Sequence, residues 1–341
     1  MEFSGLIGRY PVNRSLTEQE QAHQLYQRRR LDLTPHYQLS VIKMNSTFLE
    51  TVDKWYGWKG SATTITAAVL VVLVGMFGWM GVELILEGMG ILSSNLEAHV
   101  AIGNGLGMLA VLCVFSWGVI WILRKESFAF THYPVRYNRK NRTVHFFRTD
   151  GTVLSYPWDK LFFTLGYIPV SKLWEVRAHI LDADRMTVRE TFALSYSGTL
   201  AAGDVAPDAT DFSSTDFVRA HWEFIRRYME DGPEEISKQV QFCMPVDQQR
   251  ESVRLSFERI FANFAGAPVL IYIVMFPFCF IISLFRIFAI HTSKIPSWPA
   301  EIEASCTVEP NDPYAIEGAV DGERIAVYPK AARAAGVQFS S

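Results

Sequence analysis

The residues best placed to do chemistry in this 341-residue chain are acidic ones beside its long apolar stretches. Glu83 and Glu87 are four residues apart, so a helix would place both carboxylates on one face, and Glu97 and His99 approach from the next segment. Acids inside a membrane can mark an ion path. Because this pair comes at the outer end of the first apolar stretch, where ionised groups reach water, we expect a polar site at the membrane edge.

A basic strip is the second candidate for a binding surface. It has five cations and no acidic residue between positions 134 and 149, and its members are Arg136, Arg139, Lys140, Arg142 and Arg148. Near a membrane, each cation contributes about 1 kcal/mol toward acidic lipid headgroups. The strip is interpreted as an ordinary solvated or topology-setting face or as a surface that contacts membrane lipid or a partner protein, and both interpretations stay open. Nucleic acid is not expected, because the net charge is −3 and no recognised nucleic-acid motif accompanies the strip.

Glycines in the apolar stretches could let helices approach closely. Gly103 and Gly107 have GxxxG spacing, and Gly75, Gly78 and Gly81 offer a related surface of small residues. We predict helix packing at these positions. The spacing fits an internal helical hairpin and a homo-oligomer equally well.

Sequence signatures of catalysis and metal binding are lacking. There is no phosphate-binding loop, nucleophile elbow, HExxH helix, paired CxxC or dinucleotide-binding glycine motif, and Ser195-Tyr196-Ser197-Gly198 lacks the first glycine of an elbow. The four cysteines are scattered and match neither a zinc site nor a disulfide framework. We therefore predict a noncatalytic protein with no catalytic residue, no metal and no cofactor.

Three apolar stretches must position these residues. Thr63 to Leu86, Val100 to Leu123 and Pro268 to Ile290 each approach or exceed the roughly 20 residues that span hydrocarbon. The chain is thus expected to be an α+β membrane protein. We divide it into a helical cytoplasmic segment, a transmembrane hairpin, a soluble β-rich domain ending in an amphipathic helix, a linker helix with the third membrane segment, and an acidic tail containing prolines, at residues 1–61, 62–123, 124–245, 246–292 and 293–341.

Basic residues beside the first two stretches predict their orientation. Lys54 and Lys59 precede the hairpin, Arg124 and Lys125 follow it, and its 87–99 loop has no Lys or Arg. By the positive-inside rule, the N-terminus and the central domain should be cytoplasmic in a multi-pass protein of the bacterial inner membrane.

The third stretch gives conflicting signs. A single crossing would place the tail outside, whereas Arg286 and Lys294 near its end favour retention inside. We expect a full crossing, with Arg286 reaching the far interface, and keep as the alternative a hairpin-like or interfacial segment bent at Pro277.

Two short helical patterns occupy the N-terminal region. Ser15-Leu16-Thr17-Glu18 has capping-box spacing, and a helix is predicted to continue over Glu20 to Arg30. A second pattern follows Asn45 and includes Phe48, with Trp55 and Trp58 placed as an interfacial aromatic belt.

The central region has the composition of antiparallel strands. Alternating, β-branched and aromatic residues predict strands at Val135 to Asn138, Thr143 to Arg148, Thr152 to Trp158, Lys160 to Leu165, Trp174 to Leu181 and Thr187 to Leu194. An amphipathic helix is predicted from Ser214 or Thr215 to Met229. Strands followed by one helix are similar to a pleckstrin-homology-like roll, a comparison at the level of the fold that assigns no ligand.

Several short motifs resemble an uncharacterised proteobacterial family of membrane proteins with a domain of unknown function, often encoded near type VI secretion and toxin genes. The resemblance covers residues 45 to about 314 and includes Val135-Arg136-Tyr137-Asn138-Arg139-Lys140, Asp150-Gly151-Thr152-Val153 through Pro157-Trp158-Asp159-Lys160, Trp222 to Gly232, and Ser293-Lys294-Ile295-Pro296-Ser297-Trp298-Pro299 leading to Asn311-Asp312-Pro313-Tyr314. It implies a setting in bacterial competition and supplies no catalytic residues.

The acidic tail from Ile295 to Ser341, with seven Asp or Glu against three Lys or Arg, is expected to bind a partner or to pack Trp298 and Tyr314 onto the domain. Our leading hypothesis is an inner-membrane interaction protein, an immunity protein that binds a type VI effector. The alternatives are a pore-forming antibacterial effector and an accessory membrane subunit of the secretion machinery.

Overall fold

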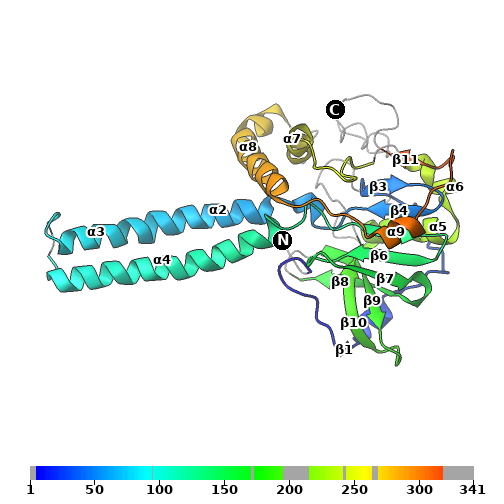
Figure 1. Cartoon of the computed structure of the whole chain (residues 1–341), viewed down its shortest axis with the longest axis horizontal. Helices are drawn as coiled ribbons and strands as arrows, with labels where there is room; N and C mark the ends of the chain where they lie inside the picture. The colour runs from blue at the N-terminus through cyan, green and yellow to red at the C-terminus, as the bar shows by residue number, and fades with distance from the viewer. Residues whose placement is uncertain are drawn as a thin grey trace.

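Two antiparallel sheets and a long helical hairpin dominate the architecture (Figure 1). In this computed structural model, residues 5–93, 95–169, 173–194, 215–240, 243–262 and 268–317 are described. The hairpin projects from one end of the two-sheet domain.

The first sheet has six strands in the order β11-β3-β4-β5-β6-β7. Its strands are β3 (Val41–Met44), β4 (Phe48–Thr51), β5 (Val135–Asn138), β6 (Thr143–Phe147), β7 (Val153–Pro157) and β11 (Ile316–Glu317). Neighbouring strands β4 and β5 are more than 80 residues apart in sequence, with Phe48 opposite Asn138. Everything between them leaves the sheet and returns to it.

That excursion is the predicted hairpin. It consists of η1 (Tyr56–Trp58), α2 (Ser61–Leu73), the π-helical segment η2 (Val74–Gly78), α3 (Trp79–Gly88) and α4 (Ala98–Glu126). Because both ends continue into adjacent strands of one sheet, the N-terminal segment and the central domain must lie on the same side of a membrane that the hairpin crosses.

The second sheet has the order β1-β10-β9-β8-β2. Its strands are β1 (Arg14–Ser15), β2 (Gln24–Leu25), β8 (Phe162–Ile168), β9 (Leu173–Leu181) and β10 (Thr187–Ala193). The six strands predicted for the central region are confirmed as β5 to β10, within about two residues at most ends. Alternation identified them because each strand has one side in the core.

The predicted N-terminal helices are largely wrong. The capping box is real but begins at Thr17, whose hydroxyl accepts from the Glu20 N–H, and α1 (Glu18–Ala22) ends before β2. The second pattern is strand β4 followed by one 3₁₀ turn. The first 61 residues therefore contribute strands to both sheets, because pairing with distant strands overrides a local helical pattern.

Helix α5 (Thr215–Glu230) confirms the predicted amphipathic helix and fills the core beside the sheets. Trp222 stacks on Trp158 with ring centroids 5.6 Å apart and lies 4.5 Å from the ring of Phe163. The short η3 (Trp158–Lys160), α6 (Pro233–Ile236) and η4 (Ser237–Gln239) border this aromatic core.

The remaining helices are α7 (Val253–Ala262), α8 (Val269–Thr292) and α9 (Ala300–Ser305). Three described helices are long and apolar enough to cross a membrane, over Tyr56–Gly88, Ala98–Glu126 and Val269–Thr292. The chain is therefore a membrane protein. Figure 1 shows α8 diverging from the hairpin rather than running alongside it.

Candidate functional site

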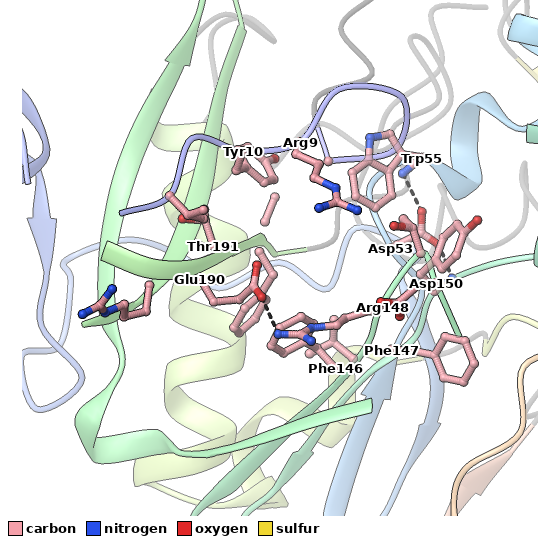
Figure 2. Close-up of a pocket in the computed structure, with 18 residues that line it drawn as sticks. Arg9, Tyr10, Asp53, Trp55, Phe146, Phe147, Arg148, Asp150, Glu190 and Thr191 are labelled. Carbon is pink, nitrogen blue, oxygen red and sulfur yellow. Dashed lines mark hydrogen bonds and ion pairs between the residues drawn. The ribbon is translucent and has the colours of Figure 1, made fainter. Parts of the chain in front are cut away.

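A groove of about 270 Å³ opens where the two sheets and the N-terminal loop meet, close to the base of the hairpin (Figure 2). One wall is the loop from Gly5 to Val12, another is strand β10, and a third is the turn after β6. Asp53 and Trp55, which lead into the hairpin, complete the lining. The groove therefore lies where the two-sheet domain meets the start of the hairpin.

The floor of the groove is aromatic and links the two sheets. Phe146 of β6 stacks on Phe192 of β10, with ring centroids 4.3 Å apart and planes inclined by 21°. Above them Arg148 pairs with Glu190, again joining β6 to β10. These contacts hold the two sheets together. The floor of the groove is therefore apolar, with the charges of Arg148 and Glu190 at its edge.

Arg9 stands at the mouth of the groove. Figure 2 shows its guanidinium between Tyr10 and Trp55, and the side chain is exposed. Within the part of the chain that the structure describes, Arg9 has no hydrogen bond or ion pair. Tyr10 is held in place from below because its hydroxyl accepts from Lys54 Nζ at 2.6 Å. Lys54 is itself bound to the buried Glu175 at 2.5 Å.

Asp53 braces the inner wall rather than facing a ligand. Its carboxylate accepts backbone N–H groups from Trp55 at 2.8 Å, Tyr56 at 3.0 Å and Tyr133 at 2.6 Å. Burial raises the pKa of Asp53 to about 6, against the opposing effect of these hydrogen bonds. The side chain therefore ties the start of the hairpin to the segment that follows it.

The outer edge of strand β10 lines the groove at Glu190 to Ala193. Among the described residues, β1 pairs with only Thr187 and Val188 of β10. On the inner edge the Leu194 N–H donates to the Val176 carbonyl. Since backbone direction alternates in an antiparallel ladder, the polar groups of Thr191 and Ala193 point outward. No strand among the described residues pairs with this part of the edge, so its backbone groups are the ones that an added strand would use.

The lining of the groove is chemically mixed. It combines a backbone edge, an aromatic floor and charges of both signs, which together suit a polar, extended polypeptide. No group of three or more His, Cys, Asp or Glu side chains able to hold a metal occurs in the described ranges.

The basic strip does not form one surface. Arg136 is 3% exposed and pairs with Glu50 at 2.7 Å. Burial lowers the pKa of Arg136, but Glu50 and Glu303 outweigh it and hold the pKa above its ordinary value. Its guanidinium is also stacked between Phe48 and Trp298, so the predicted packing of Trp298 on the domain is observed.

The other members of the strip are divided among several carboxylates. Arg142 contacts Asp159 and Glu230, and Lys140 lies 3.3 Å from Glu309 of the tail. The backbone N–H of Arg139 donates to the Thr47 carbonyl. Of the five residues of the strip, Arg148 is the one that lines the groove. Arg136 is thus unavailable to lipid, because a buried guanidinium needs its carboxylate partner.

Only part of the predicted glycine surface lies between helices. A Cβ on Gly81 would lie 3.1 Å from the Gly105 carbonyl oxygen, and one on Gly105 would lie 2.7 Å from that of Gly81. Gly78 lies near Leu112, whereas a Cβ on Gly75, Gly103 or Gly107 would meet nothing within 4 Å. Sequence reasoning missed Gly105, although the spacing of Ala101 and Gly105 carries the small-residue pattern.

The acidic pair lies at the far end of the hairpin. Glu83 is exposed and Glu87 is half-buried on α3. His99 contacts Glu97 at 3.5 Å, with both side chains 80% exposed. A polar site at the membrane edge stays a prediction.

A second polar cluster, which sequence reasoning missed, joins the membrane helices to the domain. Glu126 at the end of α4 accepts from the N–H groups of Gly60 at 3.0 Å and Thr63 at 2.6 Å, so it caps α2. Lys59 Nζ donates to the Glu126 and Phe130 carbonyls at 2.5 and 2.6 Å. The two ends of the hairpin are thereby fastened together.

Arg286 brings α8 into the same cluster. It is fully buried, binds Glu251 through Nε at 2.8 Å and Nη2 at 2.5 Å, and donates to the Tyr56 and Lys59 carbonyls at 3.1 and 3.0 Å. The Tyr56 hydroxyl also donates to Glu251, at 2.5 Å. Burial raises the pKa of Glu251, but Arg286 outweighs it and holds the pKa below its ordinary value.

Fold and groove define an α+β membrane protein with a two-sheet domain on a helical anchor. The chain belongs to the DUF6708 family of unknown function, which matches residues 112–310. That range extends from within α4 to beyond α9 and contains β5 to β10 and α5. No curated protein and no solved structure shows a significant match to the chain.

Proposed function

We propose that this is a noncatalytic, membrane-anchored binding protein whose groove receives an extended segment of a partner protein. The observation that carries the proposal is the outer edge of β10 at Thr191 and Ala193, which lines the groove beside its aromatic floor and has no strand partner among the described residues. Backbone pairing on such an edge supplies affinity, and pockets for alternate side chains supply specificity.

The charges at the groove favour a polypeptide over a simple anion. Arg9 offers a guanidinium, whereas Asp150 and Glu190 place carboxylates on the same lining. An anionic headgroup would meet these carboxylates as well as the cations. A polypeptide with side chains of both signs can satisfy both.

The order of the elements supports a pleckstrin-homology-like domain. Strands β4 to β7 form one antiparallel group, β8 to β10 form the next, and helix α5 follows. In this interpretation the membrane hairpin is an insertion between the first two strands of the roll. The domain would then present its groove at a fixed place beside the membrane.

The proposed setting is the bacterial inner membrane, with the domain in the cytoplasm. Lys54, Lys59, Arg124 and Lys125 all lie at the domain end of the hairpin, in agreement with the positive-inside rule. The family resemblance to proteins encoded near type VI secretion and toxin genes supports an antibacterial toxin as the partner. The protein would act as an immunity protein that captures this toxin at the membrane.

A pore-forming effector is the second candidate, and an accessory secretion subunit is a third. The observation favouring an assembly is the unoccupied face of α4 at Gly103 and Gly107, which would let a second copy approach closely. Production of the protein alone separates these functions. An effector would depolarise the membrane and arrest growth, whereas an immunity protein would be harmless and would restore growth of cells that make the neighbouring toxin.

A proline substitution tests the groove itself. Ala193→Pro removes an N–H that points away from β9, so the ladder between β10 and β9 is retained while pairing with a partner is blocked. The matched control is Ala300→Pro, at the exposed first residue of α9, where a helix needs no N–H. We expect Ala193→Pro to lose toxin protection and Ala300→Pro to keep it, at equal membrane levels. Protection by both variants would contradict edge pairing.

A further inference from the structure

We infer that α7 and α8 form a re-entrant hairpin that meets the membrane from the domain side, with α7 at the interface, α8 inserted in the bilayer and lipid hydrocarbon as the partner of α8. The chain would enter and leave the bilayer on one side. The segment after α8 therefore lies on the same side as the domain, whether or not the groove binds a toxin.

The contacts between the two helices have one continuous antiparallel register. Glu251 pairs with Arg286 at the domain end. Phe257, six residues after Glu251, meets Phe280, six residues before Arg286, with ring centroids 5.6 Å apart. Another step of four residues brings Phe261 to Phe276 at 5.7 Å. Helix α8 therefore returns along the path that α7 takes outward.

Both flanks of the hairpin are built into the same domain. Before α7, the Met244 N–H donates to the Val41 carbonyl at 2.7 Å. After α8, the Lys294 N–H donates to the Ala129 carbonyl at 2.8 Å. Further on, β11 pairs with β3 in the first sheet. A full crossing would carry the second set of contacts to the opposite side of the membrane, so the expected crossing by Pro268 to Ile290 does not agree with the fold.

The length of α8 indicates how deep it can reach. From Arg286 to Val269 the helix advances roughly 26 Å, at about 1.5 Å per residue. The hydrocarbon core is about 30 Å thick, so the tip can lie deep in the bilayer while both ends stay on one side.

The surface of α8 identifies lipid as the partner of this helix, whereas α7 carries Arg254, Glu258 and Arg259 and suits the interface. No Asp, Glu, Lys or Arg occurs from Val269 to Phe285. Large apolar side chains are nonetheless exposed along its length, including Val269 at 74%, Ile273 at 65% and Phe278 at 58%. The one cation near its end, Arg286, points into the domain junction and is satisfied there. A continuous apolar face of this length is favourable only in a nonpolar medium.

Pro277 fits this interpretation. It lies in the interior of α8, where it removes one backbone hydrogen bond and favours a bend. The hairpin-like alternative drawn from the sequence is therefore the one that the contacts support.

Labelling of single cysteines in intact vesicles tests the topology of the full chain. The four natural cysteines are replaced by alanine, and one cysteine is introduced at a time: Ala183→Cys in the exposed β9–β10 turn, Met89→Cys at the far end of the hairpin, and Glu309→Cys after α9. With a membrane-impermeant maleimide, we expect Glu309→Cys to be labelled from the same side as Ala183→Cys and from the opposite side to Met89→Cys. Labelling of Glu309→Cys from the Met89 side would overturn the inference.

A second measurement leaves every natural residue in place. A reporter that fluoresces only in the cytoplasm is fused before Met1 in one fusion protein and after Ser341 in another. We expect both fusions to give the same readout, and opposite readouts would refute the re-entrant hairpin. Neither result depends on whether a toxin binds the groove.

Discussion

Arg286 provides the sharpest test of how the membrane helices are joined to the domain. Its fully buried guanidinium donates to the Glu251 carboxylate through Nε and Nη2 and to the Tyr56 and Lys59 carbonyls through Nη1. Arg286→Met keeps much of the side-chain volume but leaves a buried carboxylate without its cation. Breaking a buried pair in this way costs about 3–5 kcal/mol.

The expected loss can be separated from a general effect of removing arginine. Arg254→Met is the matched control, because Arg254 is 62% exposed and forms a surface pair with Glu258 that is worth about 0.3–0.5 kcal/mol. In lipid nanodiscs we expect Arg286→Met to lower the melting temperature by on the order of 10 °C, and Arg254→Met to change it little. Adding Glu251→Gln to Arg286→Met should cost less than the sum of the two single changes.

The pH dependence of Arg286→Met gives a further sign to check. Without the cation, burial is left to raise the pKa of Glu251 above its unfolded value, so the folded variant holds a proton that the unfolded chain releases as pH rises. The difference in the free energy of unfolding between the wild type and Arg286→Met should therefore shrink as the pH is lowered from 7.5 to 5. Additive single changes, or a deficit that does not depend on pH, would refute a buried charge pair at this junction.

Two further predictions concern buried histidines and helix packing. Burial lowers the pKa of His36 to about 4 and of His221 to about 3, so the unfolded chain binds more protons below pH 6.5 and stability falls as the pH drops toward 4. Each buried imidazole should lower the free energy of unfolding by about 2 kcal/mol at pH 5 relative to neutral pH. In thermal melts, the melting temperature of His221→Phe should fall less between pH 7.5 and 5 than that of the wild type. Gly105→Leu should destabilise the hairpin by about 1–3 kcal/mol through overpacking against Gly81, whereas Gly107→Leu should be nearly neutral. Equal melting of the two leucine variants would show that α3 and α4 do not meet at Gly105.

Local patterns predicted the elements whose two faces differ. Strands β5 to β10 have alternating, β-branched or aromatic residues because at least one side of each strand lies in the core, and α5 carries its apolar residues on one side for the same reason. The hairpin was evident from the length of its apolar stretches. Each of these features is contained in a short window of sequence, so no knowledge of the partner element was needed.

Features that depend on distant partners could not be predicted in this way. Strand β4 follows a helical pattern locally and becomes a strand because β5 pairs with it across the hairpin. Arg136 belongs to a run of cations in sequence, yet it is buried by Glu50 and Trp298. The groove is assembled from an N-terminal loop and strand β10, which lie far apart along the chain. Composition gives no indication of such long-range contacts.

Site-specific photocrosslinking in native membranes tests the central claim most directly. A photoreactive amino acid replaces Val12, which lines the groove and is 41% exposed, and the control position is Lys238 on η4, away from the groove. We predict a protein adduct from Val12 that is absent from Lys238 and disappears when Ala193→Pro is added. Adducts with lipid alone, or the same protein adduct from both positions, would contradict a binding groove on this membrane-anchored domain.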